Sequence, residues 1–155
     1  MRKVTFILFL LWLSCITSFS VSAQQSKTKV PTNREYKAGP KWSYKTRPGE
    51  EGSFLIILKV ETDPKLGTIV HIALNGLKMK NRRSPDGFSE SANHLPFAKE
   101  AIDKSVLKQL KENTDLPDFE EGYQMWREAF NANRAGIYTI TVAEAVSIME
   151  ATLNQ

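Results

Sequence analysis

The chain has 155 residues, a formal net charge of +4 and one cysteine. This length suits a single domain whose core is stable without disulfides or a structural metal. Because the cysteine has no second cysteine to pair with, the composition excludes an internal disulfide framework and a metal site built from several thiolates.

The first twenty-three residues are typical of a secretory signal peptide. Arg2 and Lys3 form a positive start, residues 4–13 are apolar apart from Thr5, and small residues end at Ala23. The apolar run is shorter than the roughly 20 residues that a membrane-spanning helix needs. The sequence therefore predicts export to the periplasm or the medium, with cleavage before Gln24.

Cys15 allows a second interpretation, as the lipid attachment site of a bacterial lipoprotein. Such sites have Leu and then two small residues before the cysteine, whereas this chain has Trp12, Leu13 and Ser14, of which only Ser14 fits. Ordinary cleavage is therefore favoured. The alternative is a membrane-tethered lipoprotein, and we expect membrane contact only in that lipidated form.

Residues 24–41 are polar, contain Pro31, Gly39 and Pro40, and lack apolar periodicity, which predicts a flexible basic linker. Residues 24–47 include seven basic residues and one acidic residue, a net charge of +6. The rest of the mature chain has twelve basic and sixteen acidic residues, a net charge of −4. A basic arm attracts anionic surfaces or the acidic body itself, although a solvated terminus is the simpler interpretation. An exported chain with an acidic body argues against a nucleic-acid partner.

A single domain is expected over residues 42–155. Alternating and β-branched residues predict strands at residues 42–46, 53–61, 68–79 and 137–141. Residues 62–67 form a turn that joins the second and third strands into a hairpin, and residues 80–95 are predicted to be a loop.

Burial fixes the register of this hairpin, since a shift of one residue exchanges the two faces of a strand. Pairing Thr62 with Thr68 gathers one apolar face, which consists of Phe54, Ile56, Leu58, Val60, Val70, Ile72 and Leu74. The opposite face then places His71 beside Lys59 and near Glu61.

Apolar residues at helical spacing predict three helices, over residues 99–113, from Asp118 to before Gly136, and from Thr141 to Leu153. Thr141 and Glu144 form a capping box at the start of the last helix. The resulting order β-β-β-α-α-β-α predicts an α+β fold. We expect a small, mostly antiparallel sheet of about four strands packed on two to three helices, with Trp42, Phe54 and Trp126 in the core.

Two histidines, His71 and His94, are the strongest candidates for chemistry, with Glu61 as a nearby carboxylate. A shared metal or catalytic site requires the fold to bring them together, because the chain has no His-Glu-x-x-His or calcium-loop pattern. Structural hydrogen bonding is the simpler interpretation. Ser105 and Lys108 match the Ser-x-x-Lys pattern of serine β-lactamases, but the partner elements are missing and the match is ascribed to chance.

Acidic residues gather between the first two predicted helices, at Glu112, Asp115, Asp118, Glu120 and Glu121. A solvated acidic surface is the simplest interpretation, since a helix start favours negative charge. As a binding surface, Glu112, Asp115, Glu120 and Glu121 would prefer a basic partner. The aromatic stripe that follows is expected to be core before it is a ligand platform; it consists of Phe119, Tyr123, Trp126 and Phe130.

The segment LPDFEEGYQMWREAFNANRAGIYTITVAEAV, with HLPF before it, resembles an uncharacterised family of small exported bacterial proteins, a domain of unknown function. The similarity covers residues 42–153. It implies one exported domain and assigns no activity and no catalytic residue.

These features favour a non-enzymatic binding module of the cell envelope, of the inhibitor or immunity type, with another protein as its partner and no cofactor. The alternative is a small hydrolase or metal-dependent enzyme that uses His71 and His94. The sequence leaves the oligomeric state open.

Overall fold

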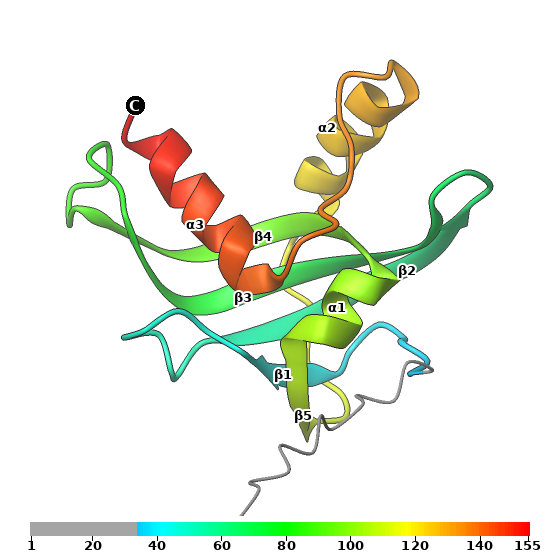
Figure 1. Ribbon diagram of the computed structural model, residues 1–155, viewed down its shortest axis with the longest axis horizontal. Helices are drawn as coiled ribbons and strands as arrows, with labels where there is room; N and C mark the ends of the chain where they lie inside the picture. Colours follow the sequence, from blue (N-terminus) through cyan, green and yellow to red (C-terminus); the bar gives the residue numbers. More distant parts are fainter. Residues whose placement is uncertain (1–33) are drawn as a thin grey trace, which may run out of the picture.

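The computed structural model describes residues 34–155 (Figure 1). The elements in order are β1 (Lys41–Tyr44), β2 (Phe54–Asp63), β3 (Gly67–Lys80), β4 (Phe88–Ala98), α1 (Lys99–Ser105), β5 (Val106–Lys111), α2 (Glu120–Asn131) and α3 (Val142–Leu153). The predicted signal peptide, Cys15 and residues 24–33 of the predicted linker lie outside the described residues.

The described strands form one sheet in the order β4-β3-β2-β1-β5, and all neighbours are antiparallel. Figure 1 shows α1 and α3 in front of this sheet. The predicted α+β class is confirmed, with one strand more than the expected four. None of the described helices is long and apolar enough to cross a membrane.

The β2–β3 hairpin has the predicted register at its turn, where Thr62 pairs with Thr68. Further along, Ile57 pairs with Ile72 and Lys59 with His71, so Leu58 is an extra residue that forms a bulge. A bulge exchanges the faces of the residues beyond it. The core face therefore contains Leu55 and Ile57 in place of the predicted Phe54, Ile56 and Leu58.

The helices cover both faces of the sheet. Val70 packs in the cluster that includes residues of α1 and α3, whereas the adjacent Ile69 packs with Tyr123 and Trp126 of α2. Because neighbouring residues of a strand point to opposite faces, α2 lies on the opposite face from α1 and α3.

The prediction of one helix over residues 99–113 is wrong. Helix α1 ends at Ser105, and the chain continues as β5, which pairs with β1. The buried Ser105 hydroxyl donates to the Ala101 carbonyl at 2.7 Å and accepts from the Val142 backbone N–H at 3.0 Å. Pairing with β1 therefore outweighs the helical pattern of residues 106–111, because a local helical preference is weak.

Replacing Ser105 with Ala is expected to destabilise the protein by about 1–3 kcal/mol, because the Val142 N–H loses its acceptor in a buried place. Urea denaturation measures this loss. Ser147→Ala is the matched control, since Ser147 also bonds a helical carbonyl four residues earlier but is exposed. Equal stabilities of the two variants would contradict this role of Ser105.

Two further elements differ from the sequence prediction. Strand β4 includes residues 88–95 of the predicted loop, because the long strand β3 pairs along them. From Ser89 to His94 the only apolar residue is Ala92, so no alternation of apolar and polar residues marks this part as a strand. The predicted strand at residues 137–141 is reduced to a single parallel bridge between Tyr138 and Phe97.

The described part of the predicted linker packs on the sheet. The Gly39 N–H donates to the Ile57 carbonyl at 2.9 Å, and the Ile57 N–H donates to the Pro40 carbonyl at 3.1 Å. The Tyr36 hydroxyl donates to Asp103 at 2.8 Å. The ordered contacts of the domain therefore begin before Trp42, the predicted boundary.

The start of α3 agrees with the sequence prediction, whereas the start of α2 differs from it. Thr141 and Glu144 form the predicted capping box of α3. Helix α2 begins at Glu120 after Phe119 and has no side-chain cap, whereas Asp118 accepts only a long 3.3 Å bond from the Glu120 N–H.

Candidate functional site

The structure brings the two histidines together on neighbouring strands. His71 lies in β3 and His94 in β4, and their rings stack with centroids 5.1 Å apart. Nδ1 of His71 lies 2.9 Å from Nε2 of His94, so one of these nitrogens donates its proton to the other.

Glu61, the predicted carboxylate, lies beside this pair and is bound from several sides. The Arg127 guanidinium donates to its Oε1 at 2.8 Å, and the Tyr123 hydroxyl donates to its Oε2 at 2.9 Å. Lys59 Nζ lies 3.9 Å from Oε2. His71 Nε2 is 3.5 Å from Oε1 and has no hydrogen-bond partner, so this contact is electrostatic.

Helix α2 covers the histidines. The rings of Tyr123 and Trp126 meet His71 edge-on, with centroid distances of 5.2 and 4.9 Å. A Cβ atom at Gly122 would lie 3.1 Å from the Cβ of His94, so glycine permits this close approach. His71 has no exposed surface.

Burial controls the charge of the pair. It lowers the pKa of His71 to about 4, against the opposing attraction of Glu61. Burial also lowers the pKa of His94. Both rings are therefore neutral near pH 7, which suits a hydrogen bond between two imidazoles.

The cluster is poorly suited to a metal ion. The facing nitrogens are 2.9 Å apart, a hydrogen-bond distance, and each would need a free lone pair to bind zinc at about 2.0–2.1 Å. Within residues 34–155 no group of three or more His, Cys, Asp or Glu side chains could hold a metal ion.

The residues of the predicted acidic surface are exposed, but they lie in different elements of the fold. Glu112 pairs with Lys37 at 3.6 Å beyond the end of β5, and Glu120 and Glu121 lie in the first turn of α2. Asp115 is exposed in the connection between these elements. The start of α2 favours negative charge, so the positions of Glu120 and Glu121 need no ligand to explain them.

The structure does not give Ser105 and Lys108 the helical arrangement that the Ser-x-x-Lys pattern requires. Ser105 is buried at the end of α1, and Lys108 is exposed on β5, so they are not one helical turn apart. The aromatic stripe is confirmed as packing, since Phe119 and Phe130 lie against the cluster of Tyr123 and Trp126.

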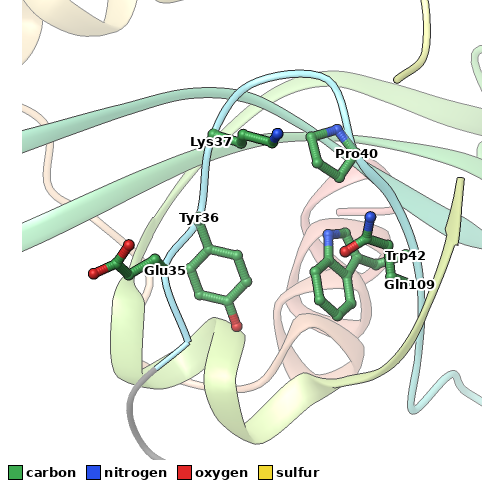
Figure 2. A pocket seen from close by; sticks show the side chains of 6 residues that line it. All are labelled: Glu35, Tyr36, Lys37, Pro40, Trp42 and Gln109. Atoms are coloured by element: carbon green, nitrogen blue, oxygen red, sulfur yellow. The ribbon is translucent and has the colours of Figure 1, made fainter. Parts of the chain in front are cut away.

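A second place that the sequence did not indicate is an open hollow on the surface. Its lining encloses about 270 Å³ and consists of Glu35, Tyr36, Lys37, Pro40, Trp42 and Gln109. We call this the Trp42 hollow. Figure 2 shows the Tyr36 and Trp42 rings on two sides of it, with Lys37 and Pro40 above and the Gln109 amide beside the indole.

The indole nitrogen of Trp42 is the unusual atom of this hollow. It is buried and has no hydrogen-bond partner. Buried donors are nearly always paired, and an unpaired one costs about 1–3 kcal/mol. An acceptor that reached the indole nitrogen would remove this cost.

Comparisons of the chain with protein-family models, with curated proteins and with solved structures find no match. The resemblance to a family of small exported bacterial proteins therefore stays a prediction.

Sequence reasoning found His71, His94 and Glu61 but missed their partners on α2. Tyr123 and Arg127 are four residues apart, and both bind Glu61. This spacing puts them on one helix face. The available signal was the hydroxyl of Tyr123 on a stripe expected to be core, with the charged Arg127 four residues later.

Proposed function

We propose that the protein is an exported, non-enzymatic binding module of the cell envelope, of the inhibitor or immunity type. Its binding site would be the Trp42 hollow, and its partner another protein that offers an acceptor oxygen to the indole nitrogen. The observation that supports this most strongly is the buried, unpaired N–H of Trp42 beside an open hollow.

The lining of the hollow is suited to a protein ligand. Two aromatic rings offer apolar contact, Lys37 and Gln109 offer donors, and Glu35 offers an acceptor. A peptide backbone has both donors and acceptors, so it matches such a mixed surface. Tryptophan and tyrosine are also the residue types that most often dominate protein interfaces.

The alternative, a small hydrolase or metal-dependent enzyme that uses His71 and His94, has less support. His71 is fully buried, and Glu61 is occupied by Tyr123 and Arg127. A general base must come within hydrogen-bond distance of its substrate. The helix that covers this cluster instead favours a structural role for it.

The proposal is tested by affinity capture from the native envelope fraction with the immobilised mature chain. Trp42→Phe keeps an aromatic ring but removes the N–H donor, and we expect it to weaken capture of a specific protein by about two- to tenfold. Met125→Ala is the control, because Met125 is 66% exposed on α2. Equal capture by wild type and Trp42→Phe would contradict the proposal.

The structure also indicates where the arm should be truncated in this assay. Deleting residues 24–41 would remove four residues that line the hollow, whereas deleting residues 24–33 leaves the lining intact. We expect the shorter deletion to retain the captured protein, and its loss would mean that the arm is the anchor.

A further inference from the structure

The outermost strand β5 has two bulges within six residues. The four residues of β1 pair only with Val106, Lys108, Gln109 and Lys111. Leu107 and Leu110 are therefore extra residues without a cross-strand partner. Both side chains are largely exposed, 54% for Leu107 and 49% for Leu110.

The two leucines occupy equivalent places along this edge. Each follows a residue on the core side of the sheet, since Val106 packs in the core cluster and Gln109 pairs with Trp42. Each is followed by a lysine that pairs on the opposite side, Lys108 or Lys111. The repeated Leu-Lys pairs form a ridge, which we call the β5 ridge.

The charge of the ridge is uncompensated. Lys111 lies directly opposite Lys41, although like charges opposite each other destabilise a sheet. Among the described residues none of Lys41, Lys108 and Lys111 forms an ion pair. Lys41 instead lies over the Phe54 ring at 3.3 Å, and the adjacent carboxylate, Glu112, pairs with Lys37.

We propose that the β5 ridge binds the surface of an anionic lipid bilayer, with Leu107 and Leu110 inserted among the lipids and Lys108 and Lys111 at the headgroups. Apolar side chains flanked by lysines are the pattern of interfacial membrane binding. Residues 24–47, with their net charge of +6, add to the same attraction. This contact would need no lipid on Cys15, and it does not depend on the Trp42 hollow.

A lipid surface fits the ridge better than an acidic protein does. The leucines protrude from bulges at the end of the sheet, so a protein partner would need pockets that match both of them. A bilayer accepts such side chains without preformed pockets. Lysine is also a flexible point charge, without the planar geometry with which arginine binds a carboxylate.

Sedimentation of the full mature chain with vesicles tests the proposal. We expect binding to equimolar phosphatidylglycerol and phosphatidylcholine, little binding to phosphatidylcholine alone, and weaker binding as salt is raised. Lys108→Gln combined with Lys111→Gln should weaken binding by about 25-fold, at about fivefold per lysine. Leu107→Gln combined with Leu110→Gln should weaken it by about tenfold or more, because apolar insertion is lost.

The turn between β2 and β3 offers a matched control. Lys65 and Leu66 are adjacent and exposed, Leu66 by 44%, so Lys65→Gln with Leu66→Gln removes the same groups elsewhere. This control should bind as wild type does, and circular dichroism should show that all variants are folded. Absence of binding to the anionic vesicles would overturn the proposal. Ridge variants that bind like wild type would also overturn it, because the basic arm alone would then account for the binding.

Discussion

Acidification from pH 6.5 to 4 is expected to lower the free energy of unfolding by roughly 3 kcal/mol, mainly because His71 is buried as a neutral ring. Its pKa is about 4 in the folded protein, because burial disfavours the charged ring, and about 6.5 when unfolded. The unfolded chain therefore binds the proton first as the pH falls. The stabilisation is complete above pH 6.5 and is lost progressively toward pH 4.

Urea denaturation of wild type and His71→Leu across this range measures the effect. The leucine has no proton to bind, so the slope between pH 6.5 and 5 should be much smaller in the variant. Carboxylates with lowered pKa values, such as Glu50 and Glu144, lose their stabilisation mainly below this window. Parallel curves for the two proteins would show that His71 is not buried as a neutral ring.

Replacing Trp126 with Ala is expected to cost about 3–5 kcal/mol, as a large side chain is removed from the packing between α2 and the sheet. Trp126 is 9% exposed, and its ring lies 4.9 Å from those of His71 and Phe130. Its N–H also donates to the Gly136 carbonyl at 2.9 Å. Denaturant unfolding measures the loss.

Phe54→Ala is the comparison for this prediction. The sequence placed both Phe54 and Trp126 in the core, but the bulge at Leu58 turns Phe54 away from the main cluster, and Phe54 is only half-buried. We therefore expect it to cost less than half as much as Trp126→Ala. Equal losses for the two variants would contradict the register described for β2.

Local patterns predicted the parts of the fold that depend on neighbouring residues. The hairpin turn at Thr62 and Thr68, the capping box at Thr141 and the aromatic stripe of α2 all agree with the structure. Each depends on burial alternation, on side-chain capping or on helical periodicity. These are properties of a short stretch of chain.

The remaining features depend on partners that are distant in the sequence. Residues 106–111 have a helical apolar pattern but form a strand, because β1 has an open edge beside them. The bulge at Leu58 leaves no signal in an apolar run, since both faces of β2 are buried there. Such contacts override local preference.

In the candidate site, too, the sequence predicted the local arrangement but not the contacts with distant residues. The hairpin register placed His71 beside Lys59 and near Glu61, and the structure confirms this arrangement. The sequence did not indicate that α2 covers these residues, because the position of a helix on a sheet is a tertiary property. That position packs α2 against the candidates for catalysis and buries His71 completely.

His71 and His94 form a structural pair in which His71 is fully buried and His94 is partly exposed. An NMR titration of the two imidazole rings, with and without equimolar Zn²⁺, is the test of this arrangement. The expected result is that His71 stays neutral down to about pH 4 and that zinc shifts the signals of neither ring at neutral pH. Titration of His71 near pH 6.5, or a shift of both rings on addition of zinc, would contradict it.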